Sequence, residues 1–164
     1  MARVDTRLLH GQVATGWTHS THPDRIIVVS DTVCHDKLRT NMIKQAAPSG
    51  VQVHVIPIKN MVKANNDPRF GDTRAMLLFE SVEDALAAVK AGVDVKEINL
   101  GSSAYKEGKV NVTKALSFDQ TDVDAIKELQ SLGVKFDVRG VPSDSPANVD
   151  ALIKSAETKL AEKK

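Results

Sequence analysis

Three Gly-Val pairs constrain the fold of this chain more than any other feature: Gly50-Val51, Gly92-Val93 and Gly133-Val134. Each pair stands where a helical pattern should end and a short apolar segment begins. Glycine can adopt the left-handed conformation that ends a helix, and valine suits the strand that follows. This alternation is typical of stacked βαβ units. We therefore predict an α/β fold with an open, mostly parallel β-sheet and helices on both faces, a Rossmann-like three-layer sandwich.

The expected strands are short runs rich in β-branched residues. They are Arg25–Val29, Val51–Ile56 and Ala75–Phe79, with shorter candidates at Ala2–Asp5, Glu97–Leu100, Ala115–Phe118 and Val134–Val138. Capping residues predict helices that start at Ser81, at Thr121 and at Ser145-Pro146. A further helix is expected just after His10, because Val13 and Trp17 are spaced to face the core together. Another should begin near Cys34-His35.

Length and charge place the chain among single-domain proteins. At 164 residues it is expected to form one domain over residues 1–164. Lys and Arg number 22 against 21 Asp and Glu, and aromatic residues make up 4%, which argues against a nucleic-acid partner. A single cysteine excludes an internal disulfide framework and a cysteine-based zinc site. Because no apolar run approaches the ~18 residues of a membrane span, the expected location is cytoplasmic.

Several polar residues follow the predicted strands directly. In open α/β sheets ligands bind outside the carboxyl ends of the strands. This topology would bring five residues to one rim: Arg7, His10, Asp31, Ser102 and Arg139. A histidine with two guanidinium groups and a hydroxyl suits the handling of a phosphoryl group. Equally, Arg139 could be an ordinary solvated residue after a terminal strand.

His10 is the pivotal residue of this rim. Neutral imidazole is a competent nucleophile near neutral pH, and its attack on a phosphoryl donor would give a phosphohistidine. Amides from Gly11 and Gln12 at the start of the predicted helix could bind the phosphoryl oxygens, and Arg7 could neutralise their charge. A histidine in a loop can also be a plain hydrogen-bonded surface residue, and its spacing alone leaves both interpretations open.

Other patterns carry weaker signals. His19 and His22 have a spacing that could hold a metal but lack a third ligand nearby, so no metal site is predicted. The glycine pattern at Gly101 lacks the further glycines of a dinucleotide-binding loop, and no P-loop motif is present. No cofactor is expected, because arginines and helix amides can neutralise the phosphoryl charge without a metal.

The segment Arg3–Val13 resembles the active-site loop of a known family. Its pattern R-V-D-x-R-L-x-H-G-Q is similar to that of the IIB component of the mannose/fructose/sorbose family in the bacterial phosphoenolpyruvate-dependent sugar phosphotransferase system. The resemblance continues through Ile26–Asp31, Ile98–Gly101 and Phe136–Pro142, and so covers nearly the whole chain in order.

This resemblance implies an activity and partners. His10 matches the histidine that is phosphorylated on Nδ1, Arg7 the arginine that supports transfer, and Asp5 the first acid of the motif. The phosphoryl group would come from a phosphohistidine on a separate IIA protein. It would pass to a sugar carried through the membrane by IIC and IID components, so this phosphoprotein would be a transferase associated peripherally with the transporter. Thr6 departs from the family, which usually has an acidic or amide residue there.

Two other functions stay open from the sequence. The chain could be a regulatory α/β domain whose phosphorylated His10 reports sugar flux, or a small-molecule-binding domain without covalent chemistry. The two phosphohistidine hypotheses differ in whether the phosphoryl group leaves to a sugar. Apolar helix faces could be buried either in the core or in a homodimer.

Overall fold

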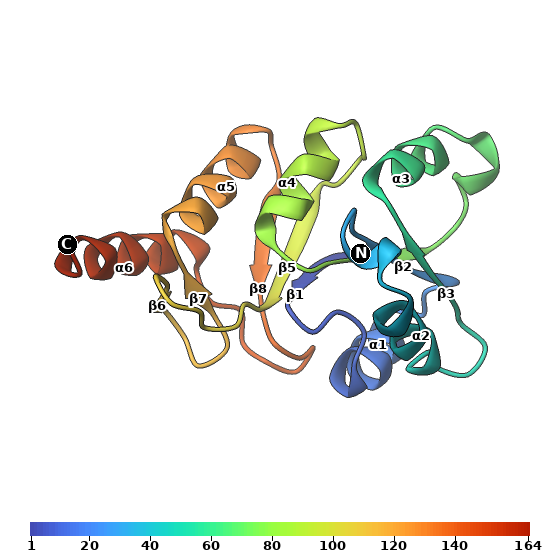
Figure 1. Ribbon diagram of the computed structural model, residues 1–164, viewed down its shortest axis with the longest axis horizontal. Helices are drawn as coiled ribbons and strands as arrows, with labels where there is room; N and C mark the ends of the chain where they lie inside the picture. The colour runs from blue at the N-terminus through green and yellow to red at the C-terminus, as the bar shows by residue number, and fades with distance from the viewer.

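The computed structural model describes residues 1–164 and is organised around one six-stranded sheet (Figure 1). The strand order is β3-β2-β4-β1-β5-β8, and every neighbouring pair is parallel. These strands are β1 (Ala2–Asp5), β2 (Arg25–Val29), β3 (Gln52–Ile56), β4 (Ala75–Phe79), β5 (Glu97–Ser102) and β8 (Lys135–Val138). The predicted parallel α/β fold is confirmed.

Helices connect the strands. The α-helices are α1 (Thr18–Thr21), α2 (Lys37–Gln45), α3 (Ile58–Asn65), α4 (Val82–Lys90), α5 (Gln120–Ser131) and α6 (Val149–Glu162). Shorter pieces are a π-helical segment η1 (Val13–Trp17) directly before α1 and two 3₁₀ turns, η2 (Val33–His35) and η3 (Pro68–Phe70). The predicted helix after His10 is present, and Val13 and Trp17 are both buried as expected.

The first strand lies at the point where the order of the strands reverses. β1 sits between β4 and β5; β2 and β3 lie beyond β4, while β8 lies beyond β5. In open parallel sheets the loops on either side of such a reversal leave a crevice at the carboxyl edge. The segment after Asp5 therefore leaves the sheet where a ligand site is most expected.

The two faces of the sheet are covered unequally. A large core cluster on one face joins the strands to α3, α4, α5 and α6, whereas a smaller cluster on the other contains Trp17 of η1 and Ile43 of α2. The smaller cluster reaches β2 and β4 through Ile26, Val28 and Met76. Helices thus occur on both faces, as predicted.

No helix covers the second face over β5 and β8 (Figure 1). The reason lies in the side chains, because Arg3, Asn99 and Asp137 are aligned in register on β1, β5 and β8 and share that face. A row of polar groups offers no apolar surface for a helix to bury. Trp17 lies against this region instead, and its indole Nε1 donates to the Gly140 carbonyl at 2.9 Å.

Two of the three Gly-Val junctions, those at Gly92 and Gly133, end a helix as the sequence predicts. Gly50, Gly92 and Gly133 have φ values of +80°, +110° and +89°, a conformation that other residues adopt only with strain. Val93 and Val134 then turn into the core, with 3% and 4% of their surface exposed. Gly92 and Gly133 directly follow the C-caps of α4 and α5, whereas Gly50 lies in a turn after α2, which already ends at Gln45.

One predicted strand has a different role. Only Ser117–Phe118 of the expected strand Ala115–Phe118 is extended, as β7, and it pairs antiparallel with β6 (Val110–Asn111) outside the main sheet. The expected strand is therefore present only in part, and it lies outside the parallel sheet. Val110 and Phe118 are both buried in the larger core cluster. The apolar residues of Ala115–Phe118 are therefore explained by the burial of this hairpin, without pairing to the main sheet.

Two predicted helix starts are displaced. The helix predicted from Thr121 begins earlier, because Asp119 and Asp122 form a reciprocal capping box. The helix predicted from Ser145-Pro146 begins later, with Asn148 as its N-cap accepting from the Ala151 amide. The Ala147 amide instead donates to the Val138 carbonyl, which keeps the preceding residues extended.

The helix predicted near Cys34-His35 is the 3₁₀ turn η2, and α2 follows after Asp36.

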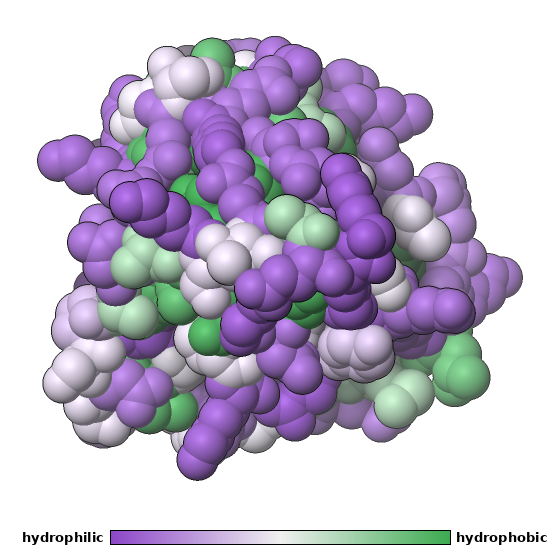
Figure 2. Space-filling view, turned by 90° about the vertical axis from the view of Figure 1, so that its left-hand side faces the viewer, coloured by the Kyte–Doolittle hydropathy of each residue, from purple (hydrophilic) through white to green (hydrophobic).

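Hydrophilic residues dominate the side of the molecule that carries α6, and its apolar residues form small separate groups (Figure 2). This agrees with an amphipathic helix whose buried residues, Ile153 and Ala156, face the sheet. None of the helices is long and apolar enough to cross a membrane.

The displaced start of α6 gives a direct test. Asn148→Ala removes the side-chain acceptor of the Ala151 amide and should lower the free energy of unfolding by about 1 kcal/mol. Ser145→Ala is the matched control and should change it by less than about 0.5 kcal/mol. Urea unfolding followed by Trp17 emission measures both. Equal losses for the two variants would contradict the observed start of the helix.

Candidate functional site

The loop between β1 and the first helix bends back on itself. Leu8 has a φ of +58°, which is uncommon for a residue with a side chain, and its amide donates to the Asp5 carbonyl at 2.9 Å. The Leu8 side chain is fully buried in the smaller core cluster together with Leu9. Burial of these two leucines offsets the backbone strain, and the bend returns His10 to the end of β1.

Asp5 is the centre of the site. Its buried carboxylate places Oδ2 at 2.9 Å from His10 Nε2 and accepts from Arg3 Nη2 at 2.9 Å. The other oxygen, Oδ1, accepts from the Arg7 amide and from Ser102 Oγ, each at 3.0 Å. Both oxygens are therefore satisfied, as a buried charge requires.

These contacts determine the charge of Asp5. Burial by itself would raise the pKa of the carboxyl, but the hydrogen bond from His10, the charge of Arg3 and the Arg7 amide outweigh it and lower the pKa. Asp5 is accordingly a carboxylate at neutral pH.

His10 consequently has one ring nitrogen hydrogen-bonded to Asp5 and one ring nitrogen without a hydrogen bond in the protein. An ionised carboxylate can only accept, so the imidazole Nε2 must carry the hydrogen that bridges to Asp5. In the neutral ring the lone pair then resides on Nδ1, which makes no hydrogen bond within the protein. The side chain is 15% exposed, so Nδ1 is the nucleophilic atom this arrangement can offer to a reactant.

Cationic and amide groups lie beside His10 in the sequence. The Arg7 side chain is exposed and makes no ion pair or hydrogen bond with the rest of the chain. The first hydrogen bond of the following helix runs from Ala14 N–H to the His10 carbonyl at 2.8 Å. The amides of Gly11 and Gln12 precede it and have no partner within the helix, which is the arrangement that binds anions at helix starts.

The predicted rim is only partly assembled. Asp5, His10 and Ser102 are in direct or shared contact, as described above. Asp31 instead accepts from the Ile58 amide at the start of α3, at 2.8 Å. Arg139 is bound by Asp137, with Nε–Oδ1 and Nη2–Oδ2 distances of 2.9 Å. Asp31 and Arg139 therefore have other partners and do not contact His10.

Arg3 also belongs to the site, although it is not among the residues predicted for the rim. It is 1% exposed, and both Nε and Nη2 donate to Asp5 Oδ2. Its other partners are Asn99 on β5 and the carbonyl of Arg139 after β8, which no spacing along the chain indicates. The available signal was a charged residue inside the short apolar strand Ala2–Asp5, because an arginine there must be paired if it is buried.

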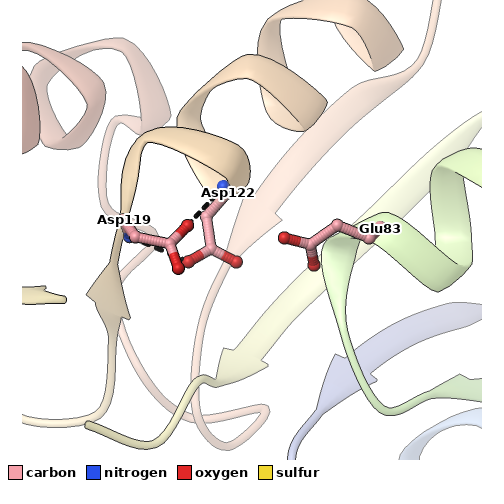
Figure 3. A group of neighbouring side chains, drawn as sticks. All are labelled: Glu83, Asp119 and Asp122. Atoms are coloured by element: carbon pink, nitrogen blue, oxygen red, sulfur yellow. Dashed lines mark hydrogen bonds between the residues drawn. The ribbon is translucent and has the colours of Figure 1, made fainter. Parts of the chain in front are cut away.

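A second cluster of carboxylates lies at the starts of α4 and α5 (Figure 3). Oxygens of Glu83, Asp119 and Asp122 lie within 4.8 Å of one another, a group that could approach a cation. Lys109 Nζ contacts Asp122, and Asp119 and Asp122 cap the start of α5 reciprocally. Burial raises the pKa of Asp122 to about 6. Helix capping and the Lys109 charge account for this cluster.

Comparison with known proteins identifies the class. The whole chain, residues 1–164, matches the family described as PTS system sorbose subfamily IIB component. The sorbose-specific EIIB component of Lacticaseibacillus casei is 39% identical over 153 residues, 93% of each chain. The crystal structure of the IIBSor domain of the sorbose permease from Klebsiella pneumoniae superposes with a TM-score of 0.90 at 39% identity, covering 94% of this chain and 95% of that one.

The mannose-specific EIIAB component of Escherichia coli (strain K12) is 41% identical over 153 residues. This match covers 93% of the present chain but only 47% of the relative, so the chain spans about half the length of that protein. The fold and the loop after β1 thus define a IIB domain of the phosphotransferase system. Within that class, the chain belongs to the sorbose subfamily of IIB components.

The Asp5 network predicts a pH-dependent stability difference. Asp5→Asn leaves the buried Arg3 without its counter-charge and should lower the free energy of unfolding at pH 7 by about 3–5 kcal/mol. Folding lowers the pKa of Asp5 from its value of 3.8 in the unfolded chain. The ionised carboxylate therefore stabilises the folded protein fully above pH 3.8, and this stabilisation is lost as the pH falls through the pKa of the folded state. The difference in free energy of unfolding between wild type and Asp5→Asn, here called the stability gap, should therefore decrease below about pH 4.

Urea unfolding monitored through Trp17, the single tryptophan, measures this gap between pH 3 and 7. Asp94→Asn is the control, because it removes one partner of an exposed pair with Lys96 and should cost less than about 1 kcal/mol. A stability gap that stays constant between pH 3 and 7 would contradict the conclusion that the charge of Asp5 stabilises the folded protein.

Proposed function

We propose that this chain, acting as a single domain over residues 1–164, is a phosphocarrier that takes a phosphoryl group onto His10 and passes it to a sugar. The donor would be the phosphohistidine of a IIA protein, and the acceptor a sugar in transit through IIC and IID membrane components. Its family membership supports this activity, because the named relatives are IIB components of phosphotransferase systems.

The observation that carries the proposal is the Asp5–His10 contact of 2.9 Å. It fixes the hydrogen on Nε2 and leaves the Nδ1 lone pair free. In the first step this lone pair forms a bond to phosphorus while the bond from phosphorus to the donor imidazole breaks. In the second step a sugar hydroxyl oxygen attacks, the Nδ1–phosphorus bond breaks and the hydroxyl proton is released.

Charge neutralisation would come from this chain's own groups. Phosphoryl transfer depends mainly on positioning and on stabilising charge at the equatorial oxygens. The exposed Arg7 guanidinium and the amides of Gly11 and Gln12 are suited to that task. Arg139 could contribute only by leaving Asp137 and the Pro142 carbonyl, so we assign it no phosphate contact.

The IIB family works with IIA, IIC and IID components. We propose that IIA and the membrane components use the His10 edge in turn, in short-lived contacts at the cytoplasmic side of the membrane. Such contacts are typically small and polar. No step requires a homodimer or a bound cofactor.

A purely regulatory or ligand-binding role is not favoured by the family match. It would predict that a phosphoryl group on His10, if formed at all, does not reach a sugar when the membrane components are supplied. Following the phosphoryl group from His10 to sugar in a reconstituted system separates these functions.

The first prediction concerns the modified atom. Incubation with phosphoenolpyruvate, the general phosphotransferase components and a matched IIA protein should place one acid-labile phosphate on the peptide that contains His10. Peptide mass spectrometry at neutral to alkaline pH and ³¹P–¹⁵N NMR should locate it on Nδ1. His10→Gln should abolish the phosphate, whereas His54→Gln, which removes a histidine paired with Arg25, should retain it. Phosphate on Nε2 would contradict the role given to Asp5.

The second prediction concerns Arg7. Arg7→Gln removes an exposed guanidinium without a structural partner, so stability should be unchanged while the rate of transfer from IIA falls by roughly a hundredfold. Arg69→Gln, an exposed arginine paired with Asp67, should transfer at the wild-type rate. Rapid-quench single-turnover measurements give the transfer rates of wild type, Arg7→Gln and Arg69→Gln. Equal rates for the three proteins would show that Arg7 does not take part in the transfer.

A further inference from the structure

Arg3 is a buried cation, 1% exposed, whose guanidinium group is hydrogen-bonded on all three nitrogens. Its Nη2 and Nε donate to Asp5 Oδ2 at 2.9 and 3.3 Å, and its Nη1 donates to Asn99 Oδ1 and to the Arg139 carbonyl. Asn99 is itself fixed, because its Nδ2 donates to the Asp137 side chain at 3.1 Å. All three guanidinium nitrogens therefore donate hydrogen bonds within the protein.

The faces of the guanidinium are confined as well. A Cβ at Gly101 would lie 2.0 Å from Arg3 Cζ, so the group rests directly on the glycine backbone. Arg3 Cζ also lies 5.3 Å from the centre of the Trp17 ring, within the range of a cation–π contact. Gly101 and Trp17 thus both pack against the Arg3 guanidinium, and we call this surrounding the Arg3 slot.

The sheet register builds this slot. The pairing of β1 with β5 shifts between Val4 and Asp5, so that Val4 faces Leu100 while Asp5 faces Ser102. The extra residue is Gly101, as in a β-bulge. The same irregularity thus frees space for Arg3 and brings Ser102 Oγ to Asp5 Oδ1.

Arg3 and His10 share one oxygen of Asp5. Oδ2 receives both the Arg3 donors and the His10 Nε2 hydrogen, while Ser102 and the Arg7 amide occupy Oδ1. Arg3 accordingly helps to set the orientation of the carboxylate relative to the imidazole. An ion pair that served only stability would not need to share the oxygen that holds the histidine.

We propose that Arg3 is a positioning residue for phosphoryl transfer, which keeps Asp5 ionised and aimed at His10 Nε2 so that Nδ1 is the nitrogen presented to the donor. This inference rests on the proposed function of His10. It assigns Arg3 no contact with the phosphoryl group, from which the Asp5 carboxylate and the imidazole separate it.

Two substitutions test the role. Arg3→Gln retains polar atoms but removes the charge, and Arg3→Lys retains the charge but cannot bridge Asp5, Asn99 and the Arg139 carbonyl at once. Lys109→Met is the matched control, since it removes the cation of a different, largely buried ion pair, with Asp122, that does not contact Asp5 or His10. Circular dichroism and urea unfolding establish that each variant is folded under the conditions used.

The decisive readout is the tautomer of His10 in the unphosphorylated protein, obtained from ¹⁵N shifts of the imidazole at pH 8.5. Wild type and Lys109→Met should show the Nε2–H form alone. Arg3→Gln should show a mixture of Nε2–H and Nδ1–H forms, and Arg3→Lys should lie between. A single Nε2–H form in folded Arg3→Gln would overturn the proposal, because a merely structural arginine leaves the tautomer unchanged.

The transfer rate supplies the second readout. In single turnover from phosphorylated IIA, Arg3→Gln should be slower by roughly tenfold to a hundredfold, comparable with the loss of groups that orient metal-binding histidines. Arg3→Lys should recover part of the rate, and Lys109→Met should match wild type. An unchanged rate in Arg3→Gln would refute the positioning role. Because the NMR measurement needs no donor, a wild-type protein that fails to take phosphate would count against the proposed function alone.

Discussion

The arrangement of the candidate site depends on the burial of one carboxylate, that of Asp5. Asp5 lies fully inside the protein at the end of the central strand, and a charge in that position must be paired and hydrogen-bonded. Arg3 supplies the opposite charge, while Ser102 and the Arg7 amide satisfy the remaining oxygen. The irregular pairing of β1 with β5 and the glycine at position 101 then follow as the conditions for burying the arginine.

The same pairing explains why the two faces of the sheet differ. Arg3, Asn99 and Asp137 form a polar row across β1, β5 and β8, so that part of the sheet cannot hold a helix. Trp17 and the segment after Arg139 lie there instead, and both arginines approach the indole ring at 5.2–5.3 Å. The opposite face is apolar and supports α3 to α6. Most of the hydrophobic stabilisation therefore lies away from the site, where it leaves the polar network undisturbed.

The elements themselves were largely predictable from local patterns. β-branched runs, helix caps and glycines with positive φ act within a few residues, so the sequence indicates them directly. The errors occurred where a distant partner intervenes. Asn148 rather than Ser145 begins α6 because Ala147 is held by Val138, and Ser117–Phe118 pairs with Val110–Asn111 instead of the main sheet.

The sequence by itself determined the alternating fold, the family and the short-range elements of the candidate site, His10, Arg7 and the helix start at Gly11. These depend on spacing along the chain. Only the tertiary structure decided that Arg3, Asp5 and Ser102 form one network with His10, and that Asp31 and Arg139 have partners elsewhere. Ser102 lies 97 residues from Asp5, and a shift of one residue in the register of β1 and β5 separates contact from no contact. Strand register is set by the packing of the whole sheet, and no local pattern encodes it.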